Sequence, residues 1–367
     1  LMGNTSSVKA KKVIDAGHLI AAPGFIDPHT HSGLINLIEP ENIPKVSQGV
    51  TTEIIGLDGL GYVPLSEKNK RDMLRYNSGL DGYPDVDYSW HSVTEYLECF
   101  RQKTSTNVAY LIPNGCLRLE LIGWDDRPAT RNEINKMQDM IRQCMSEGAV
   151  GLSSGLQYPP SMWANTDELV ELCKTTAECG GVYVTHVRVD MGDGVFDGFK
   201  EAVEIGARSN CPVHISHYFT TIPLRGQTQR MMKFVDDSRA QGVDLTFDAY
   251  PYEAGSTTLL IAIPQWAHVG GPDELLRRLQ NKNERERMRG QSPKTLGKVG
   301  GMVISAVKTK ENKWCEGLTF AEVAAKLNKD PWDLICDLLV EEDLQVAFYT
   351  FGGDMKDVKV MITHPAH

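Results

Sequence analysis

The sequence predicts an α/β protein of the (β/α)8 TIM-barrel class. Short apolar or β-branched runs alternate with longer amphipathic stretches over most of the 367 residues, which is typical of parallel strands connected by helices. Histidine or aspartate ends several of these runs, where a barrel enzyme places its catalytic groups. The alternative, an open doubly wound sheet, usually begins with a glycine-rich phosphate loop that this sequence lacks. We therefore expect a barrel.

Seven runs of the sequence have the length and composition of barrel strands. The expected strands are Gly24–His29, Thr51–Leu57, Val108–Ile112, Val150–Ser154, Val182–Val187, Pro212–His217 and Asp244–Tyr250. Helix-like stretches follow most of them and carry apolar residues three and four positions apart. The clearest are Arg131–Glu147, Thr166–Cys179, Gly198–Arg208 and Gln227–Gln241.

The alternation of strands and helices ends after the seventh expected strand. Helix-like stretches follow at Pro272–Asn283 and Phe320–Asn328, and the glycine-rich segment Gly297–Gly301 between them indicates a joint. Leu344–Phe351 is expected as an extra strand, and Val358–His364 is expected to lead toward an eighth barrel strand. Because such segments commonly form lids in barrel enzymes, we expect an insertion or lid here.

The composition favours a protein that acts on small molecules. The chain has 38 Lys and Arg against 48 Asp and Glu, a formal net charge of −10, and no basic stripe. Nucleic acid and anionic membranes are therefore disfavoured as partners, and no apolar run is long enough to cross a bilayer. The eight cysteines are scattered without a CxxC pair, which indicates reduced thiols and a cytoplasmic location. Assembly into a homo-oligomer stays open.

The segment Pro23–His31 carries the clearest chemical signal. His29 and His31 stand two positions apart at the end of the first expected strand, and residues two apart in a strand point to the same side. The two imidazoles are therefore expected to project side by side as half of a metal site. Neutral imidazoles suit Zn, Fe, Ni or Cu better than Mg or Ca.

Residues of ligand type end further expected strands. Asp58 ends the second, His186 the fifth and His217 the sixth. One such histidine can be an ordinary core residue and an aspartate before glycine is a common turn residue, but four histidines at three strand ends need a common reason. Asp248 ends the seventh run, and both it and Asp27 are expected to orient ligands or to cap the backbone.

We therefore expect one metal centre built from these strand ends. Its expected ligands are His29, His31, Asp58, His186 and His217. His214 stands three residues before His217, so in a regular strand it faces the opposite side, toward the helices. We expect a structural role for His214 and leave it outside the site.

Taken together, these motifs resemble the amidohydrolase superfamily, and within it the N-acyl-D-amino-acid deacylases, or D-aminoacylases. The resemblance runs through Ala22–Asp27 with His29 and His31, Gly49–Thr52, Gly148–Tyr158, Thr185–Arg188, Ile215–His217 and Asp248–Tyr252. It implies a metal-dependent barrel hydrolase in which the first histidine pair and two later strand-end histidines bind zinc. One tight zinc site is expected, with room for a second, weaker one at His29 and His31.

The first departure from this family concerns the bridging ligand. Many members carry a cysteine in a Gly-Asn-Cys-Gly turn, whereas this chain has Gly56–Gly59 with Asp58 in that place. The Asp58 carboxylate is therefore the expected bridge, which is feasible for zinc but lowers selectivity for softer metals. The carboxylated lysine that other superfamily members carry on strand four is missing from Val150–Leu156. Cys116 is the competing bridge and is otherwise a packed thiol.

The second departure concerns the grip on the substrate. Family members often carry a lysine soon after the strand-six histidine, whereas Tyr218 and Phe219 follow it here. Tyr158 and Arg188 are therefore the expected substrate-binding residues. Arg188 has an alternative role, in which it pairs with Asp190 and supports the site from behind.

The third departure concerns the catalytic acid and base. The family uses an aspartate in a Ser-Asp-Gly turn at the end of strand eight, which is expected just beyond His367. We therefore expect the chain to be a fragment with seven barrel strands that is inactive by itself. The expected domains are the end of a small β-sandwich-type domain at 1–22, the barrel at 23–264, the insertion or lid at 265–350 and the approach to strand eight at 351–367.

The resemblance implies hydrolysis of a linear amide. Zinc held by His186, His217 and Asp58 would supply a hydroxide that attacks the carbonyl of an N-acyl-D-amino acid, and Tyr158 would stabilise the oxyanion. The preference for D isomers follows from the resemblance alone. Two alternatives stay open: another amidohydrolase that acts on cyclic amides or on isoaspartyl or other modified dipeptides, and a catalytically inactive relative.

Overall fold

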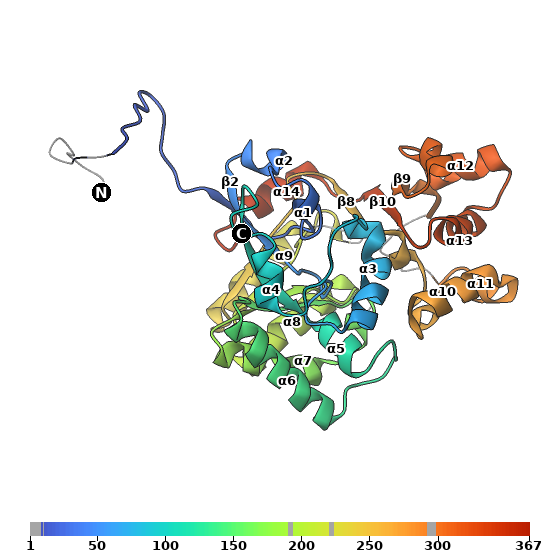
Figure 1. Cartoon of the computed structure of the whole chain (residues 1–367), viewed down its shortest axis with the longest axis horizontal. Helices are drawn as coiled ribbons and strands as arrows, with labels where there is room; N and C mark the ends of the chain where they lie inside the picture. Colours follow the sequence, from blue (N-terminus) through green and yellow to red (C-terminus); the bar gives the residue numbers. More distant parts are fainter. Residues whose placement is uncertain (1–8, 10, 190–193, 220–223, 292–298) are drawn as a thin grey trace.

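The computed structural model describes residues 9, 11–189, 194–219, 224–291 and 299–367. Its main body is a curved sheet of seven parallel strands that follow one another in chain order, with helices arranged around it (Figure 1). The strands are β1 (Phe25–Asp27), β2 (Val50–Ile55), β3 (Asn107–Pro113), β4 (Gly151–Gly155), β5 (Val182–His186), β6 (Val213–Ile215) and β7 (Leu245–Phe247). Each overlaps the run expected for it, so the prediction of a barrel with seven strands is confirmed.

The barrel helices begin where the sequence supplies capping residues. At the start of α6, the Thr130 hydroxyl accepts from the Glu133 amide while the Glu133 side chain accepts from the Thr130 amide. The Asn165 side chain caps α7 by accepting from the Glu168 amide. The barrel helices are α1 (Ile35–Ile38), α2 (Ile43–Val46), α3 (Glu67–Asp81), α4 (Val93–Glu98), α5 (Asn114–Leu121), α6 (Arg131–Ser146), α7 (Thr166–Glu178), α8 (Val195–Ser209) and α9 (Thr228–Ala240).

The core lies between the sheet and the surrounding helices. Leu152 of β4 and Ile215 of β6 are fully buried there, and burial of such apolar strand residues stabilises the packing of the helices on the sheet. One ion pair is enclosed in this core. Arg118 Nη1 of α5 lies 2.6 Å from Glu168 Oε2 of α7, and the two side chains are 0% and 1% exposed. The pair joins α5 to α7.

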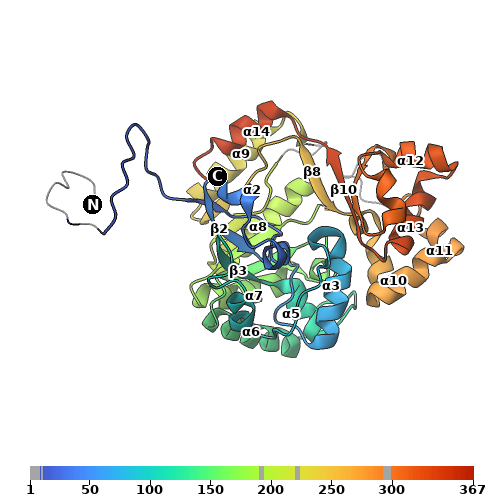
Figure 2. The ribbon, with the colours of Figure 1, turned by 45° about the horizontal axis from the view of Figure 1, so that its top comes forward.

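A second, smaller sheet follows the barrel strands. Its three antiparallel strands lie in the order β8, β10, β9, and its helices form a lobe beside the barrel (Figure 2). The elements are β8 (Ala254–Thr258), α10 (Gly271–Gln280), α11 (Lys282–Met288), β9 (Val303–Val307), α12 (Phe320–Leu327), α13 (Pro331–Glu341) and β10 (Val346–Phe351). The extra strand expected near the end of this segment is confirmed as β10. Gly297 of the expected joint lies outside the described residues.

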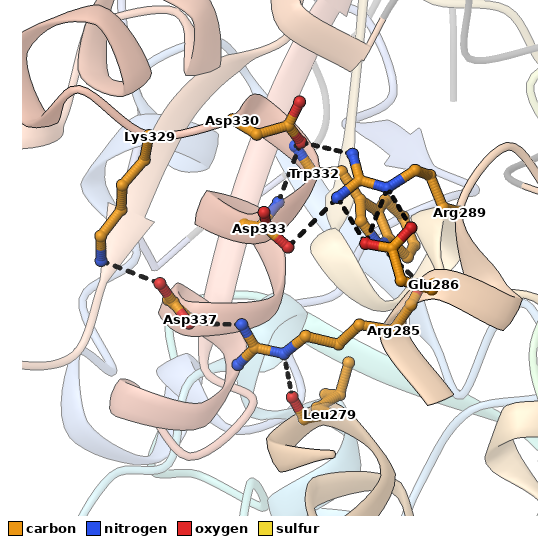
Figure 3. A network of polar contacts seen from close by, with 9 residues as sticks. All are labelled: Leu279, Arg285, Glu286, Arg289, Lys329, Asp330, Trp332, Asp333 and Asp337. Atoms are coloured by element: carbon orange, nitrogen blue, oxygen red, sulfur yellow. Dashed lines mark hydrogen bonds and ion pairs between the residues drawn. The ribbon is translucent and has the colours of Figure 1, made fainter. Parts of the chain in front are cut away.

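A polar network holds two helices of this lobe together (Figure 3). Arg289 directly follows α11, and its guanidinium pairs with two carboxylates at the start of α13. Its Nη1 lies 2.7 Å from Asp330 Oδ1, and its Nη2 lies 3.3 Å from Asp333 Oδ1. Arg285 of α11 lies 2.7 Å from Asp337 one turn further along α13. Asp330 also caps α13 through the amide of Asp333. The lobe therefore has its own internal support, separate from the barrel.

The segment before β1 and the segment after β10 complete the described chain. Residues 11–24 form no strand or helix, and Figure 1 shows them running away from the body of the molecule. The expected β-sandwich assignment of 1–22 stays a prediction. The stretch Val358–His364, expected to lead toward a strand, falls largely in helix α14 (Met355–Ile362), whose Val358 and Met361 side chains are buried. After it, the Ala366 carbonyl accepts a hydrogen bond from the Phe247 amide of β7 at 3.0 Å.

Candidate metal centre

The carboxyl ends of the barrel strands bring the expected ligands together. His29 and His31 follow β1, Asp58 follows β2, His186 is the last residue of β5, and His217 follows β6. In a parallel sheet these ends lie at one rim, which is where barrel enzymes assemble their sites. The five side chains come from widely separated parts of the sequence and form two overlapping groups. The first group is His29, His31 and Asp58, and the second is Asp58, His186 and His217.

Asp58 is the residue that the two groups share. Its Oδ2 lies 3.4 Å from His29 Nε2, 3.4 Å from His31 Nε2 and 3.8 Å from His217 Nε2. A tight turn after β2 directs it there, since Asp58 has a left-handed φ of +55° that aspartate tolerates better than most residues. Gly155 of β4 leaves room for this turn, because a Cβ there would lie 1.8 Å from the Asp58 carbonyl oxygen.

The protonation states of Asp58 and His186 suit a cation. Burial opposes ionisation of Asp58, but the neighbouring imidazoles, His29 above all, hold the pKa of its carboxyl well below the usual range. Burial, together with the His217 ring, lowers the pKa of His186 to about 3, so this imidazole is neutral. Asp58 Oδ1 is buried without a hydrogen-bond partner. A buried carboxylate with a free oxygen among four imidazoles is a donor set that fits zinc.

Polar contacts orient the rings. His29 Nδ1 lies 3.4 Å from Asp248 Oδ2, so its Nε2 faces Asp58. His186 Nε2 lies 2.6 Å from Gln157 Oε1, so its Nδ1 faces His217 Nε2 at 2.9 Å. Asp248 Oδ1 accepts from the His217 amide at 2.6 Å and so connects the first and sixth strand ends. The expectation that Asp248 supports the ligands stays a prediction that this geometry favours.

The placement expected for His214 is wrong. Its Nε2 lies 3.0 Å from Asp248 Oδ2, so the ring points toward the site and away from the helices. β6 ends at Ile215, and His217 has a positive φ of +35°. The alternation of faces does not extend through such a break, so counting three residues back from His217 assigned the wrong side. His214 contacts Asp248 and belongs to neither ligand group.

Two other candidates lie apart from the centre. The Cys116 thiol is fully buried and donates to the Gly61 carbonyl at 3.2 Å, so it acts as a packed thiol and belongs to neither ligand group. Asp27 pairs with the Lys45 ammonium and accepts from the His29 amide at 3.1 Å. Asp27 therefore supports the backbone at His29 and does not reach the ligand groups.

A cavity of about 440 Å³ opens over the metal centre. Tyr158 lines it, its hydroxyl 2.9 Å from Thr257 Oγ1 of β8 and its ring against His186 at 4.9 Å. Arg188 does not line this cavity, because its guanidinium pairs with Glu201 at 3.1 Å and donates to backbone carbonyls after β4. The alternative partner proposed for Arg188, Asp190, lies outside the described residues.

Sequence reasoning missed several residues that shape the site. Glu53 of β2 is fully buried and accepts from Ser32 Oγ at 2.9 Å, Asn36 Nδ2 at 3.1 Å and Thr106 Oγ1 at 2.6 Å. These bonds hold the segment after β1 in place. A glutamate inside an apolar strand was a visible signal, because a buried charge needs partners. Gln157 had no such signal, since glutamine in a loop is ordinary.

The sequence model described as "Amidohydrolase family" matches residues 12–367, nearly the whole chain. The chain belongs to the amidohydrolase family. Among characterised relatives, D-aminoacylase of Alcaligenes xylosoxydans xylosoxydans is 35% identical over 260 residues, which cover 70% of this chain and 52% of that protein. The N-acyl-D-glutamate deacylase of the same organism is 31% identical over 262 residues, which cover 71% and 52%. The chain thus spans about half the length of the curated relatives it matches.

Solved structures agree with this assignment. The crystal structure of D-aminoacylase superposes with a TM-score of 0.78 at 28% identity, covering 99% of this chain and 68% of that one. An N-acyl-D-glutamate deacylase from Bordetella bronchiseptica, complexed with zinc and a phosphonate mimic of the tetrahedral intermediate, gives 0.74 at 26% identity and covers 94% and 63%. Within the ranges that the structure describes, no helix combines the length and apolarity needed to cross a membrane.

Proposed function

We propose that this protein is a zinc-dependent deacylase of N-acyl-D-amino acids. One observation carries the proposal: two groups of ligand-type side chains share the buried Asp58 carboxylate beneath a cavity large enough for a small molecule. Relatives that carry the names D-aminoacylase and N-acyl-D-glutamate deacylase support this substrate class. The linear amide of an N-acyl amino acid is therefore the bond we expect to be hydrolysed.

The proposed zinc ligands are His186, His217 and Asp58, with a second, weaker place at His29 and His31. Zinc in such a site activates water as a nucleophile near neutral pH. Two of the proposed ligands, His186 and Asp58, are already in the protonation states this chemistry needs. His186 is neutral and can offer a lone pair, and Asp58 is ionised.

Tyr158 is the residue proposed to stabilise the developing oxyanion. Burial, reinforced by the Asp58 charge, raises the pKa of its phenol well above the ordinary value, so the hydroxyl keeps its proton and remains a donor. The Thr257 hydroxyl beside it and the ring contact with His186 fix its direction. A fixed donor at a position where charge develops costs no reorganisation during the reaction.

The cavity favours a neutral, apolar amino-acid side chain. Phe219, Tyr250 and Tyr252 form an aromatic wall next to His217, with Tyr250 and Tyr252 stacked at an interplanar angle of 9°. The lysine that lines the cavity, Lys45, is already paired with Asp27. An acidic side chain would therefore lose its hydration without gaining a free cation in the described part of the wall.

The first test measures amine release by the full-length gene product, with zinc supplied, from matched N-acetyl-D- and N-acetyl-L-amino acids with apolar and acidic side chains. Hydrolysis confined to the D series supports the proposal, and faster turnover of N-acetyl-D-leucine than of N-acetyl-D-aspartate supports the apolar preference. No release from any member would overturn it, and would favour cyclic-amide or modified-dipeptide hydrolysis or an inactive relative.

A second test connects the ligands to the activity. His186→Ala and His217→Ala are expected to lose zinc and hydrolysis together, whereas the exposed His91→Ala serves as a matched control that keeps both. Retention of a full zinc equivalent by the double variant of His186 and His217 would contradict the ligand assignment.

A further inference from the structure

A third carboxylate stands behind the metal centre, on the side opposite Asp58. Asp81 is the last residue of helix α3, and its Oδ1 lies 3.5 Å from His31 Nδ1. The other ring nitrogen of His31, Nε2, faces Asp58 Oδ2 at 3.4 Å. His31 is thus held between two carboxylates, of which only Asp58 belongs to a ligand group.

The surroundings of Asp81 hold its carboxylate in a fixed position next to His31. Its side chain is 10% exposed, and its Oδ2 accepts a hydrogen bond from the Tyr62 hydroxyl at 2.5 Å. Tyr62 is 2% exposed and lies on the segment that follows the Asp58 turn. Oδ1, the oxygen that faces His31, is buried and makes no hydrogen bond. A buried carboxylate oxygen is costly unless a donor satisfies it, and His31 Nδ1 is the group in position to donate.

Helix α3 is itself held in place by the second sheet. It packs against β8 and β10, and Gly79 makes this close approach possible. A Cβ at Gly79 would lie 2.7 Å from both Thr258 Oγ1 and the Val346 carbonyl oxygen. The helix end that carries Asp81 is therefore set by the lobe beside the barrel, so the position of His31 depends on contacts outside the barrel strands.

The structure assigns Asp81 as a positioning residue that, held by Tyr62, keeps the proton of His31 on Nδ1 and leaves the Nε2 lone pair directed at the metal. This inference rests on the proposed metal centre. A ring that donates to a carboxylate is oriented and is a more basic ligand. The centre is supported unevenly, because His31 has a carboxylate behind it while His186 has the neutral Gln157 amide.

The test is metal binding by the chelator-treated full-length protein, titrated with Zn²⁺ against a chromophoric chelator. His31→Ala is expected to lower the affinity for one zinc equivalent. Asp81→Asn is expected to raise the Kd of that same equivalent by about 10- to 100-fold. Tyr62→Phe is expected to shift the same equivalent in the same direction by less. Asp72→Asn is the matched control, because Asp72 lies on the same helix and pairs with Lys68 at the surface.

A double-mutant cycle separates positioning from a general structural effect. If Asp81 acts through His31, then Asp81→Asn adds no further loss of affinity in the His31→Ala background. Additive losses, or an Asp81→Asn protein that titrates as the wild type does, would overturn the inference while leaving the metal centre intact. Should Asp81→Asn fail to fold by circular dichroism, an unchanged affinity in Tyr62→Phe overturns it. A wild-type protein that binds no zinc refutes the metal centre and this inference with it.

Discussion

The buried histidine His268 makes a prediction that the structure allows to be worked out in numbers. His268 is 2% exposed in the short helical turn Gln265–His268 of the second lobe. The Tyr76 hydroxyl lies 2.8 Å from its Nδ1, and its Nε2 lies 3.2 Å from the Ile263 carbonyl oxygen. Burial raises the pKa of Tyr76, so this phenol stays protonated and donates. Both ring nitrogens are then satisfied only when the imidazole is neutral.

This arrangement lowers the pKa of His268 from 6.5 to about 4, chiefly through burial, with the Ile263 hydrogen bond opposing and the Arg278 charge assisting. As the pH falls below 6.5, the unfolded chain takes up a proton at this residue before the folded protein does. Its contribution to stability is therefore present above pH 6.5 and is lost between 6.5 and about 4. The full loss is about 3 kcal/mol, of which about 2 kcal/mol is gone at about pH 5.

The assay is urea unfolding of the wild type and of His268→Gln at about pH 7.5 and about pH 5. All other titrating groups cancel in the comparison, so the variant is expected to lose about 2 kcal/mol less free energy of unfolding than the wild type over this interval. Parallel pH dependence of the two proteins would refute the reasoning, as would a pKa near 6.5 measured for His268 by NMR.

Two further predictions concern buried charges. Arg118→Met leaves the Glu168 carboxylate buried and unpaired, so the free energy of unfolding is expected to fall by about 3–5 kcal/mol. Adding Glu168→Gln to this variant is expected to recover part of the loss. Additive losses of the two substitutions in urea unfolding would contradict the coupling between the two side chains. Asp58→Ala removes the ligand that both groups share and is expected to abolish zinc binding measured by metal analysis, whereas Asp58→Cys supplies a thiolate and keeps it. An unchanged zinc content in Asp58→Ala would show that the histidines suffice.

Much of the barrel could be predicted because its signals are local. Each strand is a short apolar run, and each barrel helix carries its own apolar spacing and often its own cap, as Thr130 does for α6. The parallel order of the strands then follows from their alternation with helices. Because parallel strands end at the same rim of the barrel, the sequence alone predicted that His29, Asp58, His186 and His217 lie close together.

Other expectations failed or stayed undecided where the local rule stopped applying. His214 was assigned to the wrong face because strand alternation was extended past the end of β6. Arg188 was expected at the substrate, but Glu201, thirteen residues further along the chain, pairs with it at 3.1 Å. No sequence pattern near Arg188 predicts Glu201 as its partner. The stretch after Val358 was expected to approach a strand and is helical in α14.

The amino-acid sequence by itself determined the fold class, the strand order and the set of candidate ligand residues, because these depend on patterns within single segments and on the alternation of strands with helices along the chain. The tertiary structure decided between Asp58 and Cys116, because it places Asp58 in both ligand groups and Cys116 as a packed thiol, and it alone showed that Asp81 stands behind His31. These contacts join residues that lie far apart in the chain. Their geometry depends on how the turn after β2, helix α3 and the second sheet pack together, and no spacing in the sequence encodes that packing.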